Sequence, residues 1–206
     1  MEELKDGESK GTKWGQRTAL VLLAIGAVLL LVASTQPLWQ VQATSPLLPD
    51  VKITVSLRFW DVSYAYPGSQ TYEPISELST AQQGALQLYL IAVLATAFLA
   101  FIGAAAAVVR YRRIGLAMAG TATLLAWAGP LAFMHFLPIS INQEPLVPFI
   151  DFQFGFWGSY EGLFTSASYG GELGWMLSLV SAAFITAGAL LLLWYAMEPR
   201  AQGTNV

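Results

Sequence analysis

The sequence predicts a mainly α membrane protein, a bundle of four transmembrane helices with a small extracellular antiparallel β-sheet formed by its two outer loops. Three observations support this fold class. Four long apolar blocks occupy most of the 206 residues. Charged residues make up only 11% of the chain, against about 25% in soluble domains. The two longest connecting segments alternate apolar and polar residues, which is the pattern of a strand with one buried face.

Composition also limits the chemistry that the chain can perform. The formal net charge of -3 argues against a nucleic-acid partner, which would require a basic face to neutralise phosphates. The absence of cysteine excludes disulfides, thiolate nucleophiles and cysteine metal sites. With most of the chain reserved for lipid, a large soluble catalytic domain does not fit.

Each apolar block is long enough to cross a bilayer as a helix. The first has no polar side chain from Ala19 to Ala33, and the other three contain no Lys, Arg, Asp or Glu. Pro130 predicts a kink in the third span. Small residues spaced four apart favour close helix packing, with an intramolecular contact as the default and a partner helix as the alternative. The predicted spans are 18–38, 85–109, 114–137 and 173–197, and the small pairs are Gly103 with Ala107, Gly115 with Ala119, and Ala183 with Ala187.

Basic residues predict the orientation, because Lys and Arg beside a span are retained in the cytoplasm. They gather in the tail 1–17, the hairpin 110–113 and the tail 198–206, whereas the loops 39–84 and 138–172 contain only Lys52 and Arg58. Both termini are therefore expected in the cytoplasm and both long loops outside a plasma membrane. The first span also resembles a signal peptide, but the acidic residues before it favour an uncleaved anchor.

The first outer loop predicts a strand from Val51 to Phe59, where apolar residues occupy every second position. The phase shifts at Phe59 and Trp60, which indicates either a β-bulge or a turn into a second strand. Pro67 and Gly68 end the run as turn residues. The helix that follows is expected to begin at a capping box, either Ser79 with Gln82 or Thr80 with Gln83.

The second outer loop repeats the alternation. Since a lone hairpin is marginal in water, both loops are expected to join one sheet whose apolar face rests on the helix ends. The apolar positions of this second predicted strand are Ile150, Phe152, Phe154 and Phe156, and they alternate with Asp151, Gln153 and Gly155.

Few residues suit catalysis. His135 is the only histidine, and it is expected to be interfacial, with a proton-sensitive role as the alternative. The spans hold no other ionisable group of the kind that transporters use. The outer loops carry an excess of carboxylates that either bind cations or keep the surface soluble. We therefore expect a protein that is not an enzyme and has no cofactor or metal site. The outer carboxylates are Asp50, Asp61, Glu73, Glu77, Glu144, Asp151, Glu161 and Glu172.

Two short motifs carry a family resemblance. The run Pro37, Leu38, Trp39, Gln40, Val41 resembles the claudin pattern of a Trp just outside the first span, followed by an extracellular strand. Leu57, Arg58, Phe59, Trp60 lies roughly where claudins have a Gly-Leu-Trp element. The chain is similar to a distant member of the claudin and peripheral myelin protein superfamily, which implies a left-handed four-helix bundle bearing an extracellular sheet. It departs from claudins in lacking the cysteine pair of that sheet.

Members of this superfamily form cell junctions, mediate adhesion or serve as auxiliary subunits of channels, so the resemblance implies a role of this kind. The expected function is a non-enzymatic scaffold whose sheet contacts other proteins within one membrane or between cells. Its partners would be the lipid bilayer and either further copies or other membrane proteins. The alternative is an accessory subunit of a larger respiratory or transport complex. Trp39 and Trp60 are expected in the sheet core, in place of the disulfide, and the candidate interaction residues are Trp39, Trp60, Phe152, Phe154, Phe156, Trp157 and Tyr160.

Overall fold

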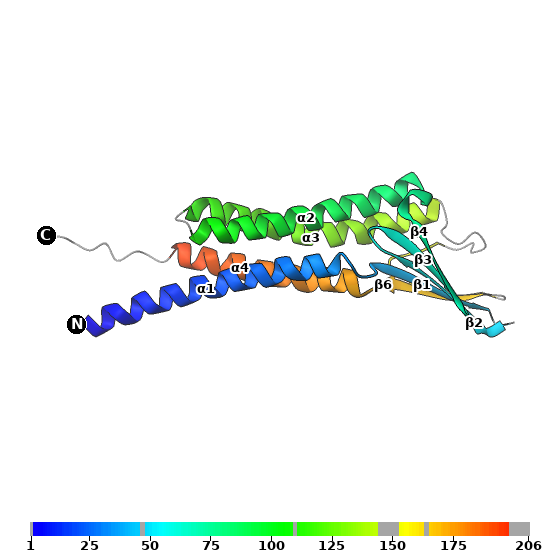
Figure 1. Cartoon of the computed structure of the whole chain (residues 1–206), viewed down its shortest axis with the longest axis horizontal. Helices are drawn as coiled ribbons and strands as arrows, with labels where there is room; N and C mark the ends of the chain where they lie inside the picture. The colour runs from blue at the N-terminus through cyan, green and yellow to red at the C-terminus, as the bar shows by residue number, and fades with distance from the viewer. Residues whose placement is uncertain (1, 46–47, 109–110, 144–152, 163–164, 198–206) are drawn as a thin grey trace.

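Four long helices and one antiparallel sheet make up the computed structural model, which describes residues 2–45, 48–108, 111–143, 153–162 and 165–197. The sheet projects from one end of the bundle, while α1 begins and α4 ends at the other (Figure 1). All four helices are long and apolar enough to cross a membrane, as the sequence predicts. They are α1 (Glu2–Ala33), α2 (Thr80–Val108), α3 (Arg112–Gln143) and α4 (Leu173–Met197).

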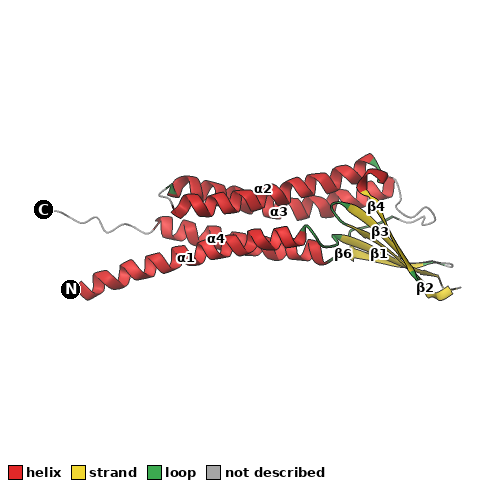
Figure 2. Ribbon diagram, viewed as in Figure 1, coloured by secondary structure: helices red, strands yellow, loops and turns green. Residues whose placement is uncertain are grey.

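The helices form two pairs, α1 with α4 and α2 with α3 (Figure 2). The predicted small-residue contact is confirmed between α2 and α3, because a Cβ added to Gly115 would lie 2.8 Å from the Gly103 carbonyl oxygen and 2.9 Å from the Ala107 nitrogen. The alanines at 183 and 187 are instead exposed on α4. Small side chains therefore set the closest approach within the α2–α3 pair.

The sheet has six strands in the order β4-β3-β2-β1-β6-β5, and every neighbouring pair is antiparallel. Both predicted outer loops contribute, because β6 pairs with β1 and places Gly171 opposite Trp39. Among the described residues, the first loop supplies four strands and the second supplies two. They are β1 (Trp39–Ser45), β2 (Leu48–Leu57), β3 (Asp61–Tyr66), β4 (Ser69–Pro74), β5 (Gly158–Glu161) and β6 (Ser166–Gly171).

The phase shift at Phe59 and Trp60 is a turn and not a bulge. The Arg58 N–H donates to the Asp61 carbonyl oxygen at 2.9 Å, and β2 passes directly into β3. The next hairpin turns at Pro67 and Gly68, whose φ of 84° is a conformation that glycine adopts without strain. A short 3-10 helix, Ile75–Glu77, then leads to α2.

The capping box at the start of α2 is confirmed as the Ser79 and Gln82 alternative. The Gln82 N–H donates to Ser79 Oγ at 3.3 Å, and the Ser79 N–H donates to Gln82 Oε1 at 3.2 Å. Two backbone donors of the first turn are thereby satisfied.

The predicted strand around 150–156 is wrong where it can be compared. Residues 150–152 lie outside the described part of the chain, and residues 153–157 are not in a strand. The side chain of Asn142 instead holds the backbone of Phe154, accepting its N–H at 2.6 Å and donating to its carbonyl oxygen at 2.9 Å. These two bonds, the Asn142 clamp, occupy the backbone N–H and carbonyl oxygen of Phe154, which a sheet would otherwise use. The strands of the second loop therefore lie farther along the chain, as β5 and β6.

Candidate interaction surface and the aromatic cluster beneath it

Aromatic side chains from the sheet and from three helices meet where the sheet joins the bundle. Each ring lies within 6.2 Å of another, centroid to centroid. All but Tyr169, which is partly buried, have 7% or less of their surface exposed. We call this set the junction cluster, and it consists of Trp39, Phe59, Tyr89, Phe133, Phe154, Phe156, Tyr169 and Trp175.

Trp39 joins the sheet to the second loop. Its indole N–H donates to the carbonyl oxygen of Phe156 at 2.9 Å, and its ring meets the edge of Phe154 at 6.0 Å. Only 1% of Trp39 is exposed. A buried Trp needs a partner for its N–H, and here that partner lies far along the chain, so Trp39 ties the two loops together.

Phe156 is where the sheet, α3 and α4 converge. Its ring lies 6.0 Å from Phe133 of α3 and 5.1 Å from Trp175 of α4. Trp175 in turn donates its indole N–H to the Pro130 carbonyl oxygen at 3.1 Å. Phe154 and Phe156 are thus packing residues of the junction and are not available to a partner.

The expectation that Trp60 packs in the sheet core is wrong, because 56% of Trp60 is exposed. Its neighbour Phe59 is buried instead, with its ring 5.1 Å from that of Tyr89 on α2. Tyr89 continues the contact to Phe133 at 4.9 Å. The turn between β2 and β3 decides which of the two adjacent aromatic residues points inward.

The remaining sequence candidates differ in exposure. Trp157 is 51% exposed and packs edge-on against Trp175 at 4.8 Å, above Gly170 of β6. Tyr160 is half-buried on β5, opposite Ala167. Phe152 lies outside the described residues. Trp60 and Trp157 are therefore the exposed candidates on the described part of the chain.

Sequence reasoning did not identify several residues of this region as site residues. Tyr89 and Phe133 lie in apolar helical runs where nothing distinguishes a residue that faces the sheet. Asn142 follows a predicted span and has no sequence motif. Each acquires its role from the tertiary position of the second loop.

Alternate residues of the sheet point to opposite faces, and one face is polar. The register aligns Gln42 with Thr54 on β2 and with Ser168 on β6. These residues belong to one cross-strand row, and none of them is charged. The neighbouring rows, such as Val41 with Val55, point to the opposite face of the sheet and belong to the hydrophobic core. The row across all six strands is Gln70, Ala65, Thr54, Gln42, Ser168 and Ser159.

Strand β4 forms one edge of the sheet, and all six of its residues are exposed. The guanidinium of Arg58 forms an ion pair with the Asp61 carboxylate at 3.2 Å. Its central carbon also lies 5.6 Å from the ring centre of Tyr72 on β4, so these contacts hold the Arg58 side chain beside the edge. Burial raises the pKa of Tyr64 on β3, and the carboxylate of Glu73 raises it further. An exposed edge strand is a template for pairing with another chain.

Neither a protein-family model nor a curated protein matches the chain.

The described residues bring together no group of three or more side chains that would ligate a metal ion. The carboxylates of Glu144 and Asp151 lie outside these residues. His135 is exposed on α3, with its ring 5.2 Å from that of Phe136.

Proposed function

We propose that this protein is a non-enzymatic, multi-pass scaffold of the cell membrane, whose sheet makes lateral or cell-to-cell protein contacts. The observation that carries the proposal is the exposed edge strand β4 on a sheet that the junction cluster packs against the helix bundle. Sheet edges bind extended segments through backbone hydrogen bonds. The partner would be a second copy of this chain or another membrane protein.

The free backbone groups of β4 follow from its hairpin. The two-residue turn joins Tyr66 to Ser69, and residues that flank such a turn exchange both hydrogen bonds. Bonded and non-bonded pairs then alternate. The N–H groups of Gln70 and Tyr72 therefore point away from β3, toward an incoming strand.

We further propose that the sheet is extracellular and both termini are cytoplasmic, as in the claudin and peripheral myelin protein superfamily, of which this chain would be a distant, cysteine-free member. Support comes from the asymmetric basic residues and from the Trp39 motif at the start of β1. The junction cluster would take the place of the claudin disulfide. Labelling of single cysteines introduced at positions 10 and 112 only from inside, and at 65 and 155 from outside, is the expected result, and labelling of position 112 on intact cells would contradict it.

The contact test compares two substitutions at one edge position. Gln70→Pro removes the outward N–H of β4 without removing a bond to β3, whereas Gln70→Ala keeps that N–H. In mild detergent, native mass measurement should find the wild type and Gln70→Ala in an assembly. Gln70→Pro should be mostly monomeric, with the assembled fraction reduced about tenfold, equivalent to about 1.4 kcal/mol.

Two outcomes count against the scaffold. One is a strictly monomeric wild type with no copurifying protein, and the other is equal assembly of both Gln70 variants. If the retained partner is a respiratory or transport complex, the alternative of an accessory subunit replaces the scaffold.

A further inference from the structure

The two helix pairs differ in how far they extend toward the sheet. The apolar part of α1 is Trp14–Ala33, about 30 Å at 1.5 Å per residue, which matches the hydrocarbon thickness of a bilayer. The N–H of Gly174, near the start of α4, donates to the Pro37 carbonyl oxygen at 2.8 Å. The end of α1 and the start of α4 therefore mark one level, where the membrane surface on the sheet side would fall.

The same level crosses α3 in its middle, because Trp175 of α4 bonds to Pro130 of α3. From Pro130, α3 continues to Gln143, which is roughly 20 Å at 1.5 Å per residue. Figure 1 shows α2 and α3 reaching beyond α1 and α4 on the sheet side. The α2–α3 pair thus passes from inside the expected hydrocarbon region to well outside it.

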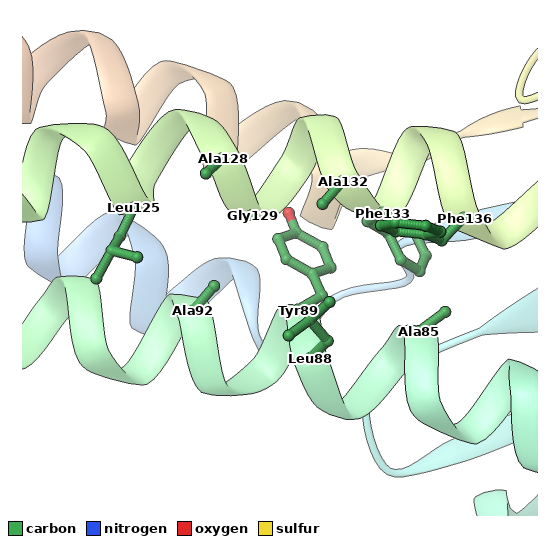
Figure 3. A pocket seen from close by; sticks show the side chains of 10 residues that line it. All are labelled: Ala85, Leu88, Tyr89, Ala92, Leu125, Ala128, Gly129, Ala132, Phe133 and Phe136. Carbon is green, nitrogen blue, oxygen red and sulfur yellow. The ribbon is translucent and has the colours of Figure 1, made fainter.

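A groove between α2 and α3 lies across this level. Its inner part has a volume of about 220 Å³, and Figure 3 shows its lining side chains. Its outer part is about 260 Å³ and continues the inner part, since both are lined by Ala85, Leu88 and Phe136. The two parts together form one lateral groove.

The groove forms where small residues lie beside large ones, and its base is the contact between Ala92 of α2 and the buried Gly129 of α3, where an added Cβ would lie 3.0 Å from the Ala92 Cβ. Ala92, Ala128 and Gly129 line the inner part, whereas Leu88 and Phe136 are 52% and 47% exposed beside them. An apolar cavity of about 150 Å³ holds a benzene molecule, so the inner part has room for a stretch of hydrocarbon chain.

The lining changes in polarity along the groove. Apart from the hydroxyl of Tyr89, the inner part is lined by apolar side chains, and the outer part adds Ser140 and Gln143. The described lining residues carry no charge. A neutral or zwitterionic amphipathic molecule, with its chain inward and its polar end outward, matches this order.

We propose that this groove binds one phospholipid of the leaflet on the sheet side. An acyl chain lies against Ala92 and Ala128, and the polar end of the lipid faces Ser140. Because Ser140 lies roughly 15 Å beyond Pro130 at 1.5 Å per residue, the bound lipid stands outward from its neighbours in the leaflet. The lipid site and the proposed function have one assumption in common, namely that the four helices span a membrane. Loss of assembly in Gln70→Pro should therefore leave lipid retention unchanged, which separates failure of one proposal from failure of the other.

The test counts phosphatidylcholine molecules that stay on the chain. The protein is reconstituted in phosphatidylcholine bilayers, extracted into mild detergent and measured by native mass spectrometry. Ala128→Phe fills the groove, and Ala183→Phe makes the same change at an exposed position of α4 outside the lining. Wild type and Ala183→Phe should each retain one phosphatidylcholine, and Ala128→Phe should show about a tenfold smaller bound fraction.

A second measurement needs no variant. Phosphatidylcholine with a photoreactive group at the end of one acyl chain should label residues 85–92 and 125–136 of the wild type more strongly than the exposed face of α4. Equal labelling of both regions, or no retained lipid on the wild type, would overturn the proposal. The proposal would also be overturned if the wild type forms a dimer, or binds a foreign protein, that Ala128→Phe releases, because the occupant of the groove would then be a protein.

Discussion

Trp39 is the residue whose removal should most loosen the sheet. Its side chain is 1% exposed and donates a hydrogen bond to the Phe156 carbonyl oxygen. Truncation of a buried aromatic residue to alanine costs about 3–5 kcal/mol. That is comparable to the roughly 2–5 kcal/mol lost when a native disulfide is removed. Trp39→Ala should therefore open the sheet, while the helices stay inserted because lipid stabilises them separately.

The assay is trypsin cleavage after Lys52, which is exposed on β2, in protein reconstituted in lipid. When reclosing is fast, cleavage follows the population of the open form. A cost of about 3 kcal/mol raises that population about a hundredfold. Trp39→Ala should be cleaved faster by that factor. Trp39→Phe keeps a ring but loses the N–H, and should fall between Trp39→Ala and the wild type.

Trp60→Ala is the matched control, since Trp60 is 56% exposed. Surface substitutions usually change stability by less than about 0.5 kcal/mol, so this variant should be cleaved nearly as slowly as the wild type. Equal cleavage of Trp39→Ala and Trp60→Ala would refute the role assigned to Trp39 in the junction cluster.

Three further changes test other contacts. Asn142→Ala removes both bonds to the Phe154 backbone and should lower stability by about 1–3 kcal/mol, measured as faster proteolysis of residues 153–157; unchanged proteolysis would contradict the clamp. Gly115→Ala places a Cβ 2.8 Å from a backbone oxygen, whereas a Cβ at Gly120 meets nothing within 4 Å, so the first should lower the melting temperature in detergent and the second should not. The folded pKa of Tyr64 lies above its ordinary value of 10.0, so the unfolded chain ionises first and sheet stability should fall as pH rises above about 10; Tyr64→Phe should reduce that fall in an alkaline unfolding curve.

The four helices could be predicted from the sequence because each apolar run is a local signal. The sequence also predicted β2, whose alternation is regular. It did not predict β4, because strand formation in Ser69–Pro74 depends on pairing with β3 and not on a pattern of its own. The alternation that ends in Phe156 is real, but it belongs to an extended segment clamped by Asn142.

The site was predicted less well than the fold. Choosing between Phe59 and Trp60 required the geometry of one turn, since a shift of one residue exchanges the two faces of a strand. Trp39 was a correct choice for the core because a motif marked it. Its partners Phe154 and Phe156 were identified as candidates, but their burial depends on contacts with distant helices.

The pairing of β1 with β6 has a consequence for biosynthesis. β1 leaves the ribosome soon after the first helix, yet the strand that covers one of its edges is made just before the last helix. Until then, any sheet that β1 to β4 form has an unpaired edge at β1 as well as at β4. Unpaired edges of this kind make folding intermediates prone to aggregation. Translation of the second loop therefore supplies the strands that complete the sheet, just before the last helix completes the bundle, and until then β1 can mispair with a neighbouring copy.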